Sequence, residues 1–478
     1  MVGALRLTWT DVDQAADACA GGLRARGIGH GDRVGLFLGN RPELVTAYFG
    51  ILRAGAVVVP LNPGLTAPEI RQLVEIAGVS LLVVDRGTAA VAAAATPDVP
   101  CVVVGAGQGA AGYEALLSVG AGESVPDAPG DEALALLIFT SGTSGVPKGA
   151  MLSHRALVAS VEQVAYTAVP VVTPDDVVLM NLPLSHVYSL AGTLGALVRV
   201  AATAVLVEGV DLARTLRMVP ECAITNVPGV PGMWAAWASD PAAAEALAGV
   251  RIGFSGSAPL PVEVQEAVHQ VTGWYLHEGY GLTEACPGVS STVVSGVARP
   301  GSVGRPLPGV DVRLVDEEGE DVDPSDGDPG EIWIRGRNLF SGYWPDGSDG
   351  PDSEGWFATG DVAYLDDDGN LHIVDRRKDV VIVSGFNVYP HEVEAVLMQH
   401  PDVAEAAVVG VPDDHTGEAV KAYVVLRDAK TSVTDLQGHC AGRLARFKRP
   451  REIVVVGALP HTVMGKVVKG QLDRGGEQ

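Results

Sequence analysis

The sequence predicts an α/β fold with a large N-terminal domain and a small α+β C-terminal domain. The chain has 478 residues, of which 47% are hydrophobic and 19% are charged, so we expect a globular protein with more than one core. Its first 110 residues alternate strand-like and helix-like segments, which is typical of a mostly parallel sheet. From residue 303 to residue 343 the pattern changes to short alternating segments, which predict a small antiparallel sheet or barrel.

The elements are assigned from apolar spacing and from flanking turn residues. In the first 110 residues we expect helices at 11–27, 42–54 and 68–77, and strands at 33–38, 56–61 and 79–84. Residues 89–130 are rich in Ala and Gly and give no clear assignment, and a second α/β stretch follows over 133–288. In the last hundred residues we expect helices at 390–399 and 432–447, and strands at 405–410 and 419–426.

The charge balance excludes some classes of partner. Lys and Arg total 33 against 58 Asp and Glu, giving a net charge of −25, so nucleic acid and anionic membrane surfaces are poor partners. The uncharged stretch 177–198 is long enough to span a bilayer, but it contains Asn181, Pro183 and His186, and we expect a buried strand, loop and helix instead. Five scattered cysteines and an N-terminus without a secretory pattern indicate a cytoplasmic protein.

The segment 137–149 carries the first sign of chemistry. An apolar run leads into a loop of hydroxyls and glycines, whose backbone N–H groups could turn toward an anion, and Lys148 supplies a positive charge for phosphate. The residues concerned are Thr140, Ser141, Gly142, Thr143, Ser144, Gly145 and Lys148. The spacing differs from that of a Walker A loop. A flexible surface turn is the alternative, and Lys148 after a buried strand favours phosphate binding.

Residues 140–149 resemble the signature of the adenylate-forming superfamily, which includes acyl-CoA synthetases, adenylation domains and beetle luciferases. Four further motifs occur in the family's order, so the resemblance covers nearly the whole chain. It implies an N-terminal AMP-binding domain at residues 1–377, with two α/β subdomains and a small β-barrel-like subdomain. A mobile C-terminal domain at residues 378–478 would follow.

The segment 280–284 resembles the family's adenine and magnesium motif. The resemblance implies that Tyr280 stacks on adenine beside Glu278 and Gly279, and that Gly281 permits close backbone approach. Thr283 would hold the α-phosphate, and Glu284, with Thr140, would bind Mg²⁺. The upstream turn with Ser257, Ala258 and Pro259 resembles the adenine-binding turn. A helix start capped by Thr283 is the alternative interpretation of this segment.

The remaining motifs lie after residue 355. Residues 355–361 resemble the ribose motif, in which Asp361 would accept hydrogen bonds from the ribose hydroxyls. Arg376 matches an arginine that contacts ribose and phosphate, Lys378 matches the inter-domain hinge, and the loop after it would bind coenzyme A through Ser384, Gly385 and Phe386. Lys466 matches the catalytic lysine, although Met464 stands where the family usually has Ser. Alone, these residues would be turn residues or solvated charges.

The resemblance also bears on the acid. Residues 182–190 lack the Asp that binds an amino group, and Gly279 stands where malonate-activating relatives have an arginine, so amino acids and malonate are disfavoured. His186 resembles a ring at the entrance to the acyl pocket, with a structural histidine as the alternative. An open apolar pocket would be lined by Val187, Gly279, Leu282 and Ala285. We therefore expect a medium-chain or long-chain fatty acid, with aryl acids second.

The implied reaction joins a carboxylic acid to ATP, giving an acyl adenylate and pyrophosphate, and then transfers the acyl group to coenzyme A. The catalytic residues would be Lys466, Glu284, Thr283 and His186, and ATP, Mg²⁺ and coenzyme A the required small molecules. The alternatives are an aryl-acid ligase, a fatty acyl-AMP ligase that loads a carrier protein, a luciferase-like oxygenase and a non-catalytic nucleotide sensor. The sensor is disfavoured because Lys466, Glu284 and Asp361 are all present. We expect a monomer or a homodimer.

Overall fold

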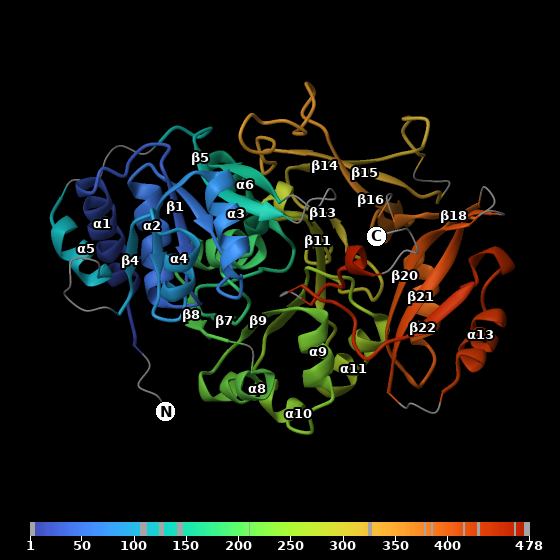
Figure 1. The fold of residues 1–478 in the computed structure, drawn as a ribbon. Helices are drawn as coiled ribbons and strands as arrows, with labels where there is room; N and C mark the ends of the chain where they lie inside the picture. Colours follow the sequence, from blue (N-terminus) through green and yellow to red (C-terminus); the bar gives the residue numbers. More distant parts are fainter. Residues whose placement is uncertain are drawn as a thin grey trace. The chain divides into compact units, whose positions relative to one another are not determined.

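The computed structural model shows mixed α/β sheets, a small antiparallel sheet and a C-terminal α+β domain, as expected (Figure 1). The structure describes residues 5–105, 112–123, 129–140, 147–209, 211–323, 327–376, 379–383, 386–413, 416–427, 431–462 and 465–472. The chain divides into two compact units. Unit 1 comprises Met1–Pro300, Pro306–Asp311 and Arg335–Phe357, and unit 2 comprises Gly301–Arg305, Val312–Ile334 and Ala358–Gln478.

The first sheet of unit 1 has the order β4-β3-β1-β2-β5-β6 and is parallel except at the β5–β6 pair. Its strands are β1 (Arg33–Phe37), β2 (Val57–Pro60), β3 (Val79–Val84), β4 (Cys101–Val103), β5 (Leu134–Thr140) and β6 (Lys148–Ser153). Its helices are α1 (Trp9–Ala25), α2 (Pro42–Arg53), α3 (Ala67–Ala77), α4 (Ala89–Ala95), α5 (Tyr113–Gly120) and α6 (His154–Gln163).

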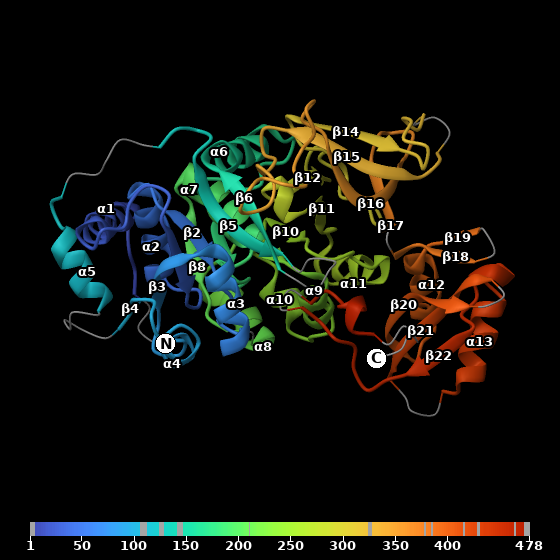
Figure 2. The ribbon, with the colours of Figure 1, turned by 45° about the horizontal axis from the view of Figure 1, so that its top comes forward.

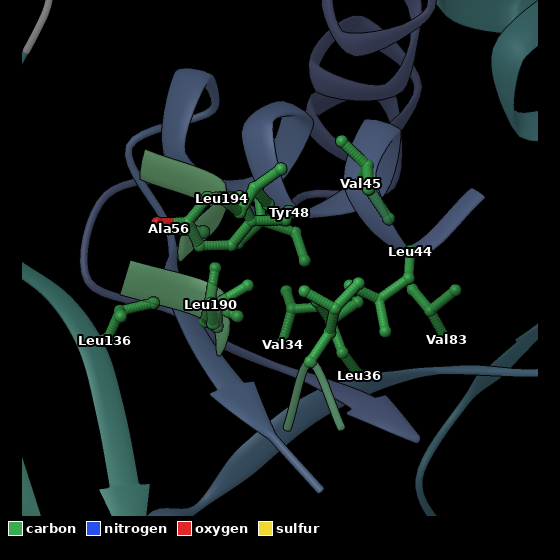
Figure 3. Close-up of a cluster of buried hydrophobic side chains, with 14 of the residues drawn as sticks. Val34, Leu36, Leu44, Val45, Tyr48, Ala56, Val83, Leu136, Leu190 and Leu194 are labelled. Carbon is green, nitrogen blue, oxygen red and sulfur yellow. The ribbon is translucent and has the colours of Figure 1, made fainter. Parts of the chain in front are cut away.

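Both faces of this sheet are buried, which explains its continuous apolar strands. In β3, Leu81 and Val83 pack into one core cluster, whereas Leu82 and Val84 pack into another with residues of α3 and α4. Successive side chains of a strand point to opposite faces, so one short strand serves two cores. Figure 3 shows part of the first cluster, where Leu190 and Leu194 lie among side chains of β1 and α2.

The second sheet of unit 1 runs in the order β13-β12-β11-β10-β9-β7-β8. Figure 2 labels β10, β11 and β12 of this sheet. Its strands are β7 (Val177–Met180), β8 (Thr203–Leu206), β9 (Asn226–Gly229), β10 (Ile252–Ser255), β11 (His277–Gly281), β12 (Gly288–Ser291) and β13 (Arg305–Pro306). Its α-helices are α7 (Gly195–Val200), α8 (Leu212–Glu221), α9 (Pro231–Ala238), α10 (Ala243–Ala246) and α11 (Val262–Thr272). The short helices η1 (Val164–Tyr166), η2 (Tyr188–Leu194) and η3 (Thr283–Ala285) complete the unit.

The uncharged stretch 177–198 is a buried strand, a loop and a helix, as expected. It consists of β7, the π-helix η2 and the start of α7. Leu190, Ala191 and Leu194 of η2 are buried in the core of unit 1. Among the described helices, none combines the length and the apolar character that a bilayer crossing requires.

Unit 2 holds two sheets. One has the order β14-β15-β16-β17 and the other β19-β18-β21-β20, with β22 beside β21. The strands are β14 (Val310–Val315), β15 (Gly330–Gly336), β16 (Phe357–Leu365), β17 (Leu371–Arg376), β18 (Val381–Val383), β19 (Phe386–Val388), β20 (Val403–Asp413), β21 (Gly417–Leu426) and β22 (Glu452–Val455). The helices are α12 (Pro390–Met398), α13 (Val433–Ala441), η6 (Arg446–Lys448) and η7 (Lys469–Gln471).

One expected helix is shorter than its sequence pattern indicates. The pattern over 432–447 predicts a single helix, but α13 ends at Ala441 and a separate 3₁₀ turn covers Arg446–Lys448. Gly442 is the C-cap residue, and glycine lowers helix stability because it loses more backbone freedom than other residues. The start is as expected, because the Ser432 side chain caps the helix together with Asp435.

Candidate functional site

The predicted phosphate loop connects two antiparallel strands, β5 and β6. Their register places Thr140, the last residue of β5, opposite Lys148, the first residue of β6. The Thr140 hydroxyl donates to the Lys148 carbonyl at 3.4 Å. The other predicted loop residues lie outside the described part of the chain: Ser141, Gly142, Thr143, Ser144 and Gly145. The two described ends of the loop therefore lie side by side.

Lys148 has two neighbours from a distant segment. Its Nζ lies 2.7 Å from Asp349 Oδ2 and 4.8 Å from the centre of the Tyr343 ring. The Lys148 side chain is 40% exposed and that of Asp349 66% exposed, so water screens the pair and we expect at most about 1 kcal/mol from it. A polyphosphate could replace Asp349 as the partner of Lys148 at little cost.

The predicted adenine and magnesium motif begins in strand β11 and continues into a tight turn. Gly281 ends the strand, and a Cβ atom at this position would lie 2.0 Å from the Pro287 carbonyl oxygen, so only glycine fits. Thr283–Ala285 forms the 3₁₀ turn η3, with Leu282 at its N-cap. The alternative interpretation, a helix capped by Thr283, is therefore wrong. Tyr280 and Thr283 are half-buried.

Three residues of the segment that precedes Trp344 form hydrogen bonds with Glu284 or with the backbone of its turn. Its side chain is buried, and its Oε1 accepts a hydrogen bond of 2.6 Å from the Tyr343 hydroxyl. The Phe340 backbone N–H donates to the Glu284 carbonyl at 2.8 Å. The Asn338 side chain donates to the carbonyls of Ala285 and Gly288, at 2.6 and 2.9 Å. One segment therefore fixes both the backbone and the carboxylate of this turn.

The carboxylate of Glu284 suits a magnesium ion that arrives with a nucleotide. Mg²⁺ keeps several waters and takes one or two protein carboxylates together with substrate phosphates. Within the described residues, no group of three His, Cys, Asp or Glu side chains could hold a metal by themselves. A single oriented carboxylate, with Lys148 over the ring of the same Tyr343, fits the binding of a metal–polyphosphate complex.

The predicted adenine-binding turn follows β10 and carries two signs of a functional site. Ser257 has a φ of 69°, an uncommon conformation for a residue other than glycine. Within the described structure, the buried hydroxyls of Ser255 and Ser257 have no hydrogen-bond partner. Buried polar atoms are rarely left unpaired without a reason. Tyr188 lies next to this turn, 3.6 Å from where a Cβ on Gly256 would stand.

Glu278 is buried immediately before Gly279 and Tyr280. Its Oε1 accepts a hydrogen bond from the Leu260 backbone N–H at 3.2 Å. Burial raises the pKa of this carboxyl from 4.5 to about 8, because the hydrogen bond only partly offsets the loss of hydration. Glu278 is therefore mostly protonated at neutral pH, and its O–H can donate a hydrogen bond.

His186 lies two residues before the π-helix η2. Its Nδ1 accepts a hydrogen bond from the Tyr188 backbone N–H at 3.2 Å, which places the proton of a neutral ring on Nε2. Burial lowers the pKa of His186 to about 4. The ring is therefore uncharged at neutral pH. This backbone contact is the one that the structural alternative predicts, and it leaves Nε2–H as the group able to meet a ligand.

The four predicted acyl-pocket residues differ in exposure. Val187 is buried in the core of unit 1 beside residues of η2, and Ala285 is fully buried in η3. Gly279 and Leu282 are half-buried. A Cβ on Gly279 would lie 3.1 Å from the Ser290 carbonyl oxygen, so the backbone here is closely packed. Gly279 and Leu282 thus keep surface that a substrate could contact.

Unit 2 brings the predicted ribose residues together. Strands β16 and β17 are antiparallel, and their register pairs Asp361 with Arg376. Asp361 is buried, and its backbone N–H donates to the Thr359 hydroxyl, which itself donates to the Ile332 carbonyl at 2.9 Å. Gly360, between them, has a φ of 75°. The sheet therefore brings the backbone positions of Asp361 and Arg376 opposite each other on neighbouring strands.

Lys466 lies in a hairpin turn near the C-terminus. The Thr462 N–H donates to the Lys466 carbonyl at 2.7 Å, and the Lys466 N–H donates to the Thr462 hydroxyl at 3.1 Å. His461 lies 3.3 Å from Glu405. Lys466 is exposed. The described residues of this turn therefore place the predicted catalytic lysine at the surface of unit 2.

The predicted hinge and coenzyme A loop are largely outside the described residues. Lys378, Ser384 and Gly385 fall there, as does Met464. Phe386 begins the described strand β19, which pairs with β18. The roles of these residues stay predictions.

Comparison with protein families decides the identity of the chain. Residues 2–344 match the family of AMP-binding enzymes, and residues 392–466 match the AMP-binding enzyme C-terminal domain. The chain belongs to the AMP-binding enzyme family. It is an enzyme of the acid–CoA ligase type, as the resemblance implied.

Relatives of this AMP-binding enzyme match along almost its whole length. The long-chain-fatty-acid–CoA ligase of Yersinia pestis is 33% identical, over 98% of this chain and 89% of the relative. The 4-coumarate–CoA ligase 5 of Oryza sativa subsp. japonica is 36% identical, over the same shares of both chains.

Solved structures also match the AMP-binding enzyme closely. ATP-bound MatB from Rhodopseudomonas palustris has a TM-score of 0.89 at 31% identity, over 98% of this chain and 93% of the other. The o-succinylbenzoate CoA synthetase of Bacillus subtilis, with its acyl-adenylate intermediate, has a TM-score of 0.85 at 29% identity, over 99% and 94%.

Proposed function

We propose that the protein activates a carboxylic acid with ATP and transfers the acyl group to coenzyme A, and that the acid is a medium-chain or long-chain fatty acid. The first part rests on an arrangement in unit 1, where Tyr343 contacts both Lys148 and Glu284. Lys148 is the residue that we assign to phosphate binding, and Glu284 is the carboxylate that we assign to metal binding. The ATP-bound and adenylate-bound relatives support nucleotide binding by this chain.

The chemical task of the first step is to bring two anions together. The substrate carboxylate attacks the α-phosphorus of ATP, the bond to the bridging oxygen breaks, and pyrophosphate leaves. Mg²⁺ bound with the nucleotide would neutralise phosphate charge. Lys148 would bind the phosphates, Glu284 would orient their metal, and Lys466 would stabilise the charge that develops at the α-phosphate. The Thr283 hydroxyl would donate to the same phosphate.

In the second step the coenzyme A thiol attacks the adenylate carbonyl carbon, and AMP leaves with the electron pair of the broken acyl–oxygen bond. Asp361 and Arg376 would hold the ribose and phosphate through both steps. The C-terminal domain, from residue 378, would rotate about Lys378 to replace Lys466 with the loop that carries Ser384 and Gly385. His186, neutral at neutral pH, would border the acid through Nε2–H.

A fatty acid is favoured by two observations. Gly279 and Leu282 offer no charge to a second polar group of the acid, and long-chain-fatty-acid–CoA ligases match over 98% of the chain. An aryl acid is the second candidate, favoured by the 36% identity to a 4-coumarate–CoA ligase.

The test is ATP–pyrophosphate exchange with a panel of fatty acids of graded length, hydroxycinnamic and benzoic acids, and dicarboxylic acids. We expect exchange with fatty acids, and acyl-CoA formation when coenzyme A is added. Exchange confined to aryl acids would refute the fatty-acid assignment. Exchange without thioester formation would favour carrier loading, and no exchange with any acid would refute the ligase proposal.

A further inference from the structure

We propose that Tyr343 is a positioning residue that orients Glu284 for the metal of MgATP. The proposal rests on the proposed function, because it concerns how that site binds its nucleotide. The Tyr343 hydroxyl donates to Glu284 Oε1 at 2.6 Å, and its ring lies under the Lys148 ammonium at 4.8 Å. One side chain therefore touches the two groups assigned to metal and phosphate.

The segment that carries Tyr343 is fixed on both sides. Toward β6, the Met151 N–H donates to the Gly342 carbonyl at 3.1 Å, and the Trp344 N–H donates to the Gly149 carbonyl at 2.8 Å. Toward η3, Phe340 and Asn338 donate to the backbone of the turn that holds Glu284. Tyr343 is thus anchored to the strand of Lys148 and to the turn of Glu284.

The hydrogen bond restricts how the Glu284 carboxylate can turn. A carboxylate can accept on both oxygens, and Tyr343 occupies a lone pair of Oε1. The buried carboxylate is therefore held in one rotamer, with Oε2 available as the ligand. Without the hydroxyl the side chain could rotate, and binding of the metal would have to fix it again. The loss should appear only when a metal is present.

The cation–π contact has a separate consequence. The Tyr343 ring lies beneath the Lys148 ammonium whether or not its hydroxyl is present. Tyr343→Phe keeps the ring and removes the hydroxyl that donates to Glu284. This variant therefore separates the metal side of the site from its phosphate side.

The experiment measures ATP binding by calorimetry on the full chain, with Mg²⁺ and with EDTA. For Tyr343→Phe we expect about 10-fold weaker binding in Mg²⁺ and unchanged binding in EDTA. Tyr275→Phe is the matched control, because its hydroxyl also bonds a glutamate, Glu266, at 3.1 Å, outside the predicted site. It should bind ATP like the wild type in both conditions.

A double-mutant cycle with Glu284→Gln makes the test specific. If Tyr343 acts through Glu284, adding Tyr343→Phe to Glu284→Gln should cause no further loss in Mg²⁺. An equal loss with Mg²⁺ and with EDTA would show a merely structural role and overturn the proposal, as would unchanged affinity in Mg²⁺. A wild-type protein that binds no ATP in either condition would instead refute the proposed function itself.

Discussion

The buried carboxyl of Glu278 makes folding stability depend on pH in a direction that can be worked out. Its pKa is about 8 in the folded protein and 4.5 as a free side chain. Between these values the folded protein binds the proton and the unfolded chain does not, so the free energy of unfolding falls as pH rises. Each pKa unit corresponds to about 1.4 kcal/mol, so the full effect approaches about 5 kcal/mol above pH 8.

The perturbation is Glu278→Gln, which removes the charge and keeps an oxygen for the Leu260 N–H. From pH 5.5 to pH 7.5, the stability of the wild type relative to this variant should fall by about 2–3 kcal/mol. The assay is urea unfolding at three or four pH values, followed by tryptophan fluorescence. Comparing the two proteins cancels the pH dependence of their other titrating groups, including His186.

The control is Glu263→Gln, which removes the same charge from an exposed position on α11. It should show no such pH-dependent difference from the wild type. If the relative stability of wild type and Glu278→Gln stays constant from pH 5.5 to 7.5, Glu278 is ionised in the folded protein and the reasoning from burial is wrong. A difference of the opposite sign would refute it equally.

Three further predictions concern catalysis and the nucleotide turn. Lys466→Ala should slow ATP–pyrophosphate exchange about 10²–10³-fold while sparing thioester formation from supplied acyl adenylate, and equal loss of both would contradict its role. Lys378→Pro should slow thioester formation more than exchange in single-turnover assays, and equal slowing would argue against a hinge. Gly281→Ala should abolish ATP binding and lower the melting temperature, because its Cβ would lie 2.0 Å from the Pro287 carbonyl oxygen; wild-type behaviour would show that the turn can move.

Much of the fold can be predicted because local signals agree with it. The helices α1, α2 and α3 and the strands between them lie within a few residues of their expected positions. The secondary structure of residues 89–130 could not be predicted from the sequence, because its elements are short. α4 has seven residues and β4 has three, which is too few for a periodic pattern. The pattern over 432–447 does not reveal that α13 ends at Ala441, where Gly442 follows as the C-cap residue.

The residues of the candidate site also differ in how far the sequence predicts them. The sequence predicts that Thr140 and Lys148 lie close together, because a short loop joins their strands. Glu284 could be predicted as a site residue because it belongs to one contiguous motif. Tyr343 could not be found in this way, because 59 residues separate it from Glu284. The pair of Asp349 and Lys148 spans 201 residues. Contacts of this kind depend on how the sheets and loops pack, and a pattern in the sequence does not encode their partner.

The ion pair between Lys148 and Asp349 bears on discrimination among anions. A small anion such as chloride or inorganic phosphate would have to displace a carboxylate that is tethered nearby and therefore present at high effective concentration. A triphosphate with its metal would make several contacts at once and could displace the same carboxylate. Because the pair is worth at most about 1 kcal/mol, Asp349 would weaken the binding of such anions to Lys148 by no more than about fivefold. The preference of Lys148 for a triphosphate over free phosphate and salt would therefore come mainly from the additional contacts of the triphosphate and its metal.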